Sequence, residues 1–169
     1  MPSLTSLNTL PASDFTAALS GIFEHSPWIP AQVAAARPFA SVEALHAAMC
    51  QVLAAAGEAK QLDLIRAHPE LAGRAAIRGE LTEASTREQR GAGLDQCSPE
   101  EYAELQRLNA AYQARFGFPF ILAVRGHTRQ SILEQMAARL HHERAREIAT
   151  AIGQIEQIAA FRLGDLLTA

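Results

Sequence analysis

Hydrophobic residues recur along the chain at three- and four-residue intervals, the spacing of one face of an α-helix. Ser13 and Ser41 are placed to cap two such segments, and a shorter one runs over residues 61–67. Further helices are predicted from about Thr128 and from about Arg144. The apolar positions of these five segments predict the following buried faces: Phe15, Ala18, Leu19, Ile22 and Phe23; Leu45, Ala48, Met49, Val52 and Leu53; Leu62, Leu64 and Ile65; Ile132, Leu133, Met136 and Leu140; Ile148, Ile152, Ile155, Ala159, Leu163 and Leu166.

The clearest helix signal is the segment SPEEYAELQRLNAAYQARFG, residues 98–117. Ser98 is a typical N-cap, Pro99 suits the first helical position, and Glu101 completes a capping box. Gly117 ends the helix. The predicted inner face consists of Tyr102, Leu105, Leu108, Tyr112 and Phe116.

One segment departs from the helical pattern. FPFILAVRG, residues 118–126, is short, apolar and rich in residues that favour strands. Because no second strand candidate could pair with it, we interpret it as an extended buried connection. The pattern therefore predicts an all-α fold, a single-domain helical bundle of about seven to nine helices spanning residues 1–169.

Composition and charge argue against several classes of protein. The chain has 169 residues, is 49% hydrophobic and carries a formal net charge of −3, which argues against disorder and gives no electrostatic case for binding nucleic acid or an anionic membrane. No apolar run approaches the roughly 20 residues of a membrane span, and neither terminus resembles a signal peptide or a peroxisomal address. The two cysteines, Cys50 and Cys97, match no metal-site spacing. They are expected to be reduced thiols, which favours a cytoplasmic location.

His68 is the first candidate for chemistry. Pro69 disfavours the α conformation at the residue before it, so His68 is expected where a helix ends. Such a position suits a functional side chain, and an ordinary histidine pKa near 6.5 suits proton transfer at neutral pH. The alternative is a histidine that is merely exposed or satisfied within the core.

The segment STREQ, residues 85–89, is the second candidate. Ser85 and Glu88 have the spacing of a capping box, with Ser85 at the N-cap. The first turn of a helix also offers free N–H groups that can hold an anionic ligand. Both interpretations can hold together, with Ser85 capping the helix and Gln89 facing a ligand.

The remaining candidates are weaker. Arg125 and Arg162 could bind a carboxylate through their forked guanidinium groups, although Arg162 could equally extend along the surface into solvent. His141 and His142 are adjacent, so they diverge on a helix and are interpreted as a solvated face rather than a metal pair. Core packing is the favoured interpretation of two aromatic residues, Trp28 and Phe39.

Several blocks read together resemble one known family. FEHSPWIPAQVAAARPFAS, LIRAHPELAGR, LTEASTREQRGAGLD, LNAAYQARFGFPFILAVRG and RLGDLL occur in the order seen in the OHCU decarboxylases, the 2-oxo-4-hydroxy-4-carboxy-5-ureidoimidazoline decarboxylases of the ureide pathway. The resemblance extends from about Phe15 to Leu167. It implies a carboxy-lyase that converts OHCU to (S)-allantoin and CO2, the last step of urate degradation to allantoin.

The resemblance also implies roles for individual residues. His68 matches the family's catalytic histidine, and Glu88 matches a glutamate that orients the substrate. Substrate contacts are implied for the following residues: Pro69, Ser85, Thr86, Arg87, Gln89, Phe120, Ile121, Leu122, Ala123, Val124 and Arg162.

No cofactor and no metal are expected, because the substrate has an imine beside the carbon that carries the carboxylate and supplies its own electron sink. The expected partners are the small-molecule substrate and a second copy of the chain in a homodimer, with no nucleic acid and no membrane. Two alternatives stay open: a non-enzymatic helical interaction module, and a decarboxylase of a related ureido acid.

Overall fold

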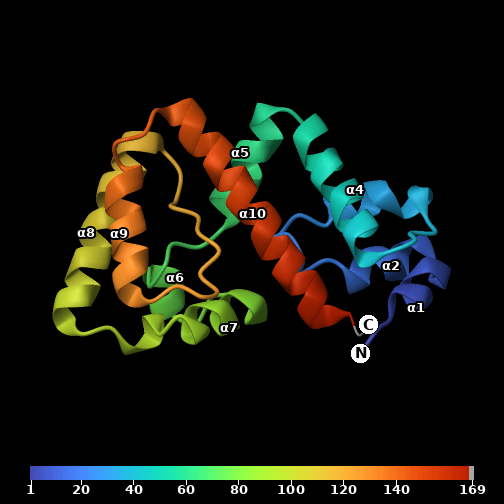
Figure 1. The fold of residues 1–169 in the computed structure, drawn as a ribbon, viewed down its shortest axis with the longest axis horizontal. Coiled ribbons are helices and arrows are strands. Elements are labelled where there is room, and N and C mark those ends of the chain that lie inside the picture. The colour runs from blue at the N-terminus through green and yellow to red at the C-terminus, as the bar shows by residue number, and fades with distance from the viewer. Residues whose placement is uncertain (168–169) are drawn as a thin grey trace. The chain divides into compact units, whose positions relative to one another are not determined.

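The computed structural model describes residues 1–167, without the side chains of residues 74 and 75, and this part of the chain forms helices and connections with no β-strand. The all-α prediction is confirmed. In chain order the elements are α1 (Leu4–Thr9), α2 (Ala12–Ala18), α3 (Trp28–Val33), η1 (Ala34–Ala36), α4 (Val42–Ala55), α5 (Glu58–Ala67), α6 (Arg74–Ile77), α7 (Glu83–Gly91), η2 (Leu94–Gln96), α8 (Pro99–Phe116), α9 (Arg129–Arg139) and α10 (Arg144–Leu166) (Figure 1).

The chain divides into two compact units. The first unit contains Met1–Leu64 and the residues from Glu156 onward, and the second contains Ile65–Ile155. Two helices, α5 and α10, contain the residues at which the chain passes from one unit to the other.

Helices α1 to α4 lie in the first unit. Ser41 caps α4 as predicted, since its hydroxyl accepts a hydrogen bond from the Ala44 N–H at 3.0 Å. The predicted N-cap at Ser13 is wrong: the N-cap is Pro11, two residues earlier, and α2 begins at Ala12, which leaves Ser13 inside the first turn. The helix also stops at Ala18, yet the apolar residues after it are buried in the irregular segment that follows. Fully buried side chains of this unit include Leu7, Phe15, Leu19, Phe23, Ile29, Leu45, Met49 and Leu53.

Helices α8 and α9 lie side by side in the second unit (Figure 1). The predicted start of α8 is confirmed, with Ser98 and Glu101 forming a reciprocal capping box and Gly117 ending the helix in the left-handed conformation. One residue of the predicted inner face is placed wrongly, because Tyr102 is 38% exposed. Asn109, which was not predicted for that face, is 3% exposed. Tyr102 stands in the first turn, where it borders a pocket instead of the core.

Two other helices differ in extent or face from the prediction. Helix α5 begins at Glu58, before the predicted residue 61, and ends at Ala67 as expected. Helix α10 begins at Arg144 as expected, but Ile148 and Ile152 are only half-buried. The fully covered face of α10 is formed at four-residue intervals by Glu147, Ala151, Ile155, Ala159 and Leu163.

Residues 118–124 form the buried connection that the sequence predicts, whereas Arg125 and Gly126 at the end of the predicted segment are exposed and lie in a turn. Buried peptide groups need hydrogen-bond partners, and this segment finds them on side chains because it pairs with no strand. Arg139 Nη1 donates to the Ile121 carbonyl at 2.6 Å, and the Ala123 N–H donates to Gln154 Oε1 at 2.9 Å. Phe118 and Phe120 both pack edge-on against Tyr112.

A buried charged cluster joins α8, α9 and α10. Glu147 is fully buried and accepts hydrogen bonds from Tyr112 at 2.5 Å and from Arg139 Nε at 2.8 Å. His142 Nδ1 lies 2.9 Å from its other oxygen, so the prediction that His142 belongs to a solvated face is wrong, whereas His141 is exposed. Burial alone would raise the pKa of Glu147, but its hydrogen bonds from Tyr112 and His142 and the charge of Arg139 hold that pKa below its ordinary value of 4.5.

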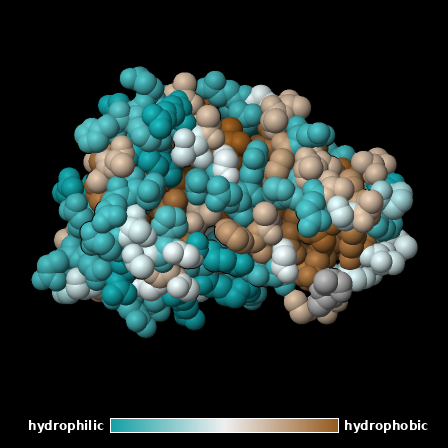
Figure 2. All heavy atoms as spheres, in the orientation of Figure 1, coloured by the Kyte–Doolittle hydropathy of each residue, from teal (hydrophilic) through white to brown (hydrophobic). Residues whose placement is uncertain are grey.

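Hydrophilic residues cover most of the visible face, and apolar residues show through in patches (Figure 2). Cys50 and Cys97 are both free thiols, and burial together with the charge of Glu156 raises the pKa of Cys50 to about 11.

Phe39 is buried as predicted, whereas Trp28 is half-buried with Lys60 Nζ 5.1 Å from its ring centre. Among the described residues, none of the helices is long and apolar enough to cross a bilayer.

Candidate active site

His68 lies directly after the last residue of α5. Its backbone N–H donates to the Ile65 carbonyl at 3.2 Å, and the chain then leaves the helix through Pro69, as the His-Pro sequence predicts. The side chain is buried, with 7% of the residue exposed. Burial excludes the simplest alternative, a histidine that faces water.

Helix α7 holds Ser85, Thr86, Arg87, Glu88 and Gln89. The predicted N-cap at Ser85 is wrong, because Thr82 occupies that position and its hydroxyl accepts the Ser85 N–H at 3.2 Å. Ser85 is therefore the third helical residue, and Glu88 lies one full turn further along. Ser85 is 4% exposed and Glu88 is half-buried, which places both on a covered side of the helix rather than at its tip.

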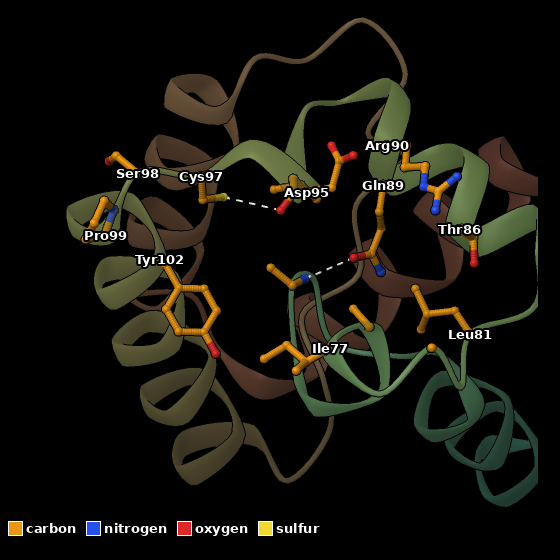
Figure 3. Close-up of a pocket in the computed structure, with 14 residues that line it drawn as sticks. Ile77, Leu81, Thr86, Gln89, Arg90, Asp95, Cys97, Ser98, Pro99 and Tyr102 are labelled. Carbon is orange, nitrogen blue, oxygen red and sulfur yellow. Dashed lines mark hydrogen bonds between the residues drawn. The ribbon is translucent and has the colours of Figure 1, made fainter.

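Gln89 extends from α7 towards the turn that follows His68 (Figure 3). Its Oε1 accepts the Ala72 N–H at 3.0 Å, and its Nε2 makes a longer contact of 3.5 Å with the Glu70 carbonyl. The side chain is buried. The amide that was expected to face a ligand thus binds the backbone beside the candidate catalytic histidine.

A pocket of about 540 Å³ lies between α6, α7, η2 and the start of α8 (Figure 3). Thr86 and Gln89 are the two predicted contact residues that border it, whereas Arg87 is exposed. The described residues that line it do not include His68, Ser85 or Glu88. Its lining consists of Ala72, Ala76, Ile77, Gly79, Leu81, Thr86, Gln89, Arg90, Leu94, Asp95, Cys97, Ser98, Pro99 and Tyr102.

Arg162 lies in the first compact unit and is 6% exposed, so it is not a surface arginine extending into solvent. Its Nη2 lies 2.9 Å from Glu24 Oε1, and its Nη1 donates to the Gly21 carbonyl at 3.0 Å. Glu24 is itself 2% exposed. Arg162 therefore binds a carboxylate within the chain itself, the side chain of Glu24.

The predicted substrate-lining segment, residues 120–124, is buried throughout. All five residues are between 1% and 7% exposed. The Ile121 carbonyl and the Ala123 N–H are already bonded to Arg139 and Gln154. Ligand contacts from this segment would have to use its other peptide groups or its side chains.

Sequence reasoning missed two residues on α8 that contact the turn after His68. Gln106 Nε2 donates to the Ala72 carbonyl at 2.9 Å, and Asn109 Nδ2 donates to the Leu71 carbonyl at 2.9 Å. A signal was present for Asn109, which follows Leu105 by four residues and therefore falls on the apolar face of the helix. Nothing in the sequence marks Gln106 as a contact residue, because glutamine is common on the half-exposed side of a helix.

No cluster of three or more His, Cys, Asp or Glu residues within the described part of the chain could hold a metal ion. The expectation of a site without metal or cofactor remains a prediction that rests on the substrate's own chemistry.

Comparison with known proteins gives a consistent result. A sequence model described as OHCU decarboxylase matches residues 8–164. The chain is 44% identical over 168 residues to the uric acid degradation bifunctional protein PucL of Bacillus subtilis, a match that covers 99% of this chain and 33% of that protein. It is 40% identical over 162 residues to the 2-oxo-4-hydroxy-4-carboxy-5-ureidoimidazoline decarboxylase of Haloferax volcanii, with 96% and 94% covered. The chain thus spans a third of the first relative and nearly all of the second.

A solved structure agrees with these sequence matches. The crystal structure of (S)-allantoin synthase is similar to this chain with a TM-score of 0.80 at 26% identity. The similarity covers 98% of this chain and 54% of that one.

Proposed function

The chain belongs to the OHCU decarboxylase family, and we propose that it converts OHCU to (S)-allantoin and CO2. The observation that carries the proposal is the match of the family model to residues 8–164, a range that includes every candidate site residue. The buried His68 at the exit of α5 supports it from the structure.

The reaction makes limited demands on the protein. The bond between the carboxylate and the hydroxyl-bearing carbon breaks, and its electron pair moves towards the adjacent imine, whose nitrogen takes up a proton. The hydroxyl then loses its proton to become a carbonyl, while the former imine carbon gains one, so that one proton is consumed overall. The protein has to orient the substrate, move these protons and deliver the last one to a single face.

We assign proton handling to His68, because it is the candidate whose ordinary pKa lies nearest neutrality. Glu88 would hydrogen-bond the substrate hydroxyl, with Ser85 beside it on the same helix. Arg162 would attract the substrate carboxylate, in competition with Glu24, its partner at 2.9 Å. The remaining contacts are assigned to Pro69, Thr86, Arg87, Gln89 and residues 120–124.

The test is to generate OHCU in the cuvette from urate, with urate oxidase and hydroxyisourate hydrolase, and to follow (S)-allantoin by circular dichroism. The wild type should form (S)-allantoin much faster than spontaneous decay does. His68→Asn keeps a polar side chain but cannot exchange protons near pH 7, so its rate should fall by about 10²- to 10⁴-fold. Failure of the wild type to accelerate the reaction would favour the interaction module, and acceleration with other ureido acids would favour the related decarboxylase.

Two controls make the histidine result specific. His141→Asn changes an exposed histidine and should retain the wild-type rate. Binding of (S)-allantoin and the melting temperature should change little in His68→Asn if the loss concerns proton transfer. A wild-type rate and pH profile in His68→Asn would move the proton-transfer role to Glu88.

We also propose that the enzyme is a cytoplasmic homodimer. The resemblance to the family supports the dimer, and the two free cysteines support a reducing compartment. Light scattering of the purified chain tests the dimer directly, and an observed mass near 18.2 kDa would contradict it.

A further inference from the structure

We infer that Gln106 and Asn109 of α8 are positioning residues for His68, acting together with Gln89 of α7. They hold the turn at residues 69–73 that fixes one side of the histidine, while α5 fixes the other. The inference rests on the proposed role of His68 and assigns these amides a place in the same reaction.

Three side-chain amides bind the backbone of two consecutive residues of this turn, Leu71 and Ala72. The Leu71 carbonyl accepts from Asn109, the Ala72 carbonyl accepts from Gln106, and the Ala72 N–H donates to Gln89. Each of these bonds is 2.9 or 3.0 Å long. The turn is therefore held from two separate helices, and its own internal bond from the Gly73 N–H to the Glu70 carbonyl is longer, at 3.3 Å.

The turn is strained and tightly packed, so it depends on these outside bonds. Ala72 has a φ of +50°, a left-handed conformation that costs a residue with a Cβ about 1–2 kcal/mol. A Cβ added at Gly73 would lie 2.8 Å from Glu70 Cβ, which leaves no room for a larger residue without movement. Strain of this kind persists where surrounding contacts enforce one conformation, commonly at functional sites.

Asn109 supports a positional role over simple packing. It is 3% exposed on a face otherwise filled by apolar residues, and its Oδ1 has no hydrogen-bond partner among the described atoms. A buried acceptor without a partner costs roughly 1–3 kcal/mol, a cost that an apolar residue would avoid. The gain that offsets it is the bond from Nδ2 to the Leu71 carbonyl.

The path from these bonds to the histidine is short and stiff. Leu71 follows His68 by three residues, and Pro69 between them has its φ fixed by the ring. A shift of the turn therefore reorients His68 directly. Because misplacement by about 1 Å can cost 10²-fold in rate, loss of the bond from Gln106 or Asn109 should reduce turnover without removing any group that is assigned a substrate contact.

The test uses Gln106, whose half-exposed side chain can be changed with little risk to folding. Gln106→Met keeps the length and removes the donor, and its kcat should fall about 10- to 100-fold with KM changed less than threefold. Gln106→Lys restores a donor and should recover most of the lost kcat. Gln113→Met, at an exposed site on the same helix, is the matched control and should behave as wild type.

A second measurement does not depend on activity. The imidazole signals of His68, followed by NMR as pH is varied, should shift in Gln106→Met and remain unchanged in Gln113→Met. Equal losses of kcat in Gln106→Met and Gln106→Lys would overturn the inference, because packing rather than the donor would then matter. Unaltered His68 signals in Gln106→Met would also overturn it.

The two hypotheses fail in different ways. A wild type that does not accelerate decarboxylation would contradict the proposed function, and the NMR comparison would still decide whether Gln106 positions His68. An active wild type with full kcat and an unchanged pH profile in Gln106→Met would leave the proposed function intact and exclude the positioning role.

Discussion

Glu88 is the residue whose role in the reaction can be separated most cleanly from its role in the fold. Thr82 caps α7, so Glu88 takes no part in the cap and stands in the second turn of the helix. A glutamine at that position has nearly the same helix propensity and the same shape. A change in activity at this site would therefore reflect contact with substrate rather than damage to the helix.

Glu88→Gln should reduce the rate of (S)-allantoin formation by at least about 10²-fold, while the free energy of unfolding changes by less than about 0.5 kcal/mol. The circular dichroism assay and a urea titration measure the two quantities. Glu83→Gln, an exposed change in the first turn of the same helix, serves as the control and should keep full activity. A stable and fully active Glu88→Gln protein would remove Glu88 from the site.

The ends of a helix can be predicted from the sequence when the residues that cap it lie within a few positions of one another. The start and end of α8 could be predicted because Ser98, Pro99, Glu101 and Gly117 all act within a few residues of one another. The predicted start of α7 is wrong because Thr82 and Ser85 are both residue types that cap helices. The sequence alone does not show which of the two occupies the N-cap position.

The buried polar residues could not be predicted in the same way, because their partners are distant in sequence. Arg139 bonds residues 8 and 18 positions away, and Arg162 meets Glu24 across 138 positions. Periodicity assigns a residue to a face of a helix, but it does not show which polar group will meet it there. For the candidate site, the position of His68 followed from Pro69, whereas the amides that hold its turn became visible only in the structure.

The cap of α7 provides a test at the scale of a single element. Thr82→Ala removes the acceptor for the Ser85 N–H and should lower the free energy of unfolding by about 1 kcal/mol. Thr82→Asn retains an N-cap acceptor and should stay close to wild type in the same urea titration. If Thr82→Ala is as stable as Thr82→Asn, Thr82 does not cap the helix in solution.

Among the described residues, each compact unit contains a buried arginine–glutamate pair. Arg162 and Glu24 lie in the first unit, and Arg139 and Glu147 lie in the second. Removing one partner of either pair should lower the free energy of unfolding by about 3–5 kcal/mol, because the remaining charge would stay buried without its partner. Tyr112 and His142 also contact Glu147.

The cluster around Glu147 predicts how stability depends on pH. The pKa of Glu147 in the folded chain lies below its ordinary value of 4.5, because hydrogen bonds and the charge of Arg139 outweigh the effect of burial. The unfolded chain therefore binds a proton at this residue more readily than the folded chain does, and acid favours unfolding. The contribution of Glu147 should be complete above about pH 4.5 and should disappear as the pH falls through the lower folded-state pKa.

Urea titrations of the wild type between pH 7 and pH 3 should accordingly show the free energy of unfolding falling on the acid side of pH 4.5. Glu147→Gln should be less stable at pH 7, because Arg139 loses its buried partner, and its stability should depend less on pH in the acid range. Glu134→Gln removes an exposed carboxylate of α9 and should preserve the wild-type dependence. Because Glu147→Gln risks unfolding, carboxyl NMR of the wild type gives a direct second measurement. A Glu147 signal that titrates above pH 4.5 would contradict the assignment, since the buried cluster would then favour the protonated acid over the ion pair.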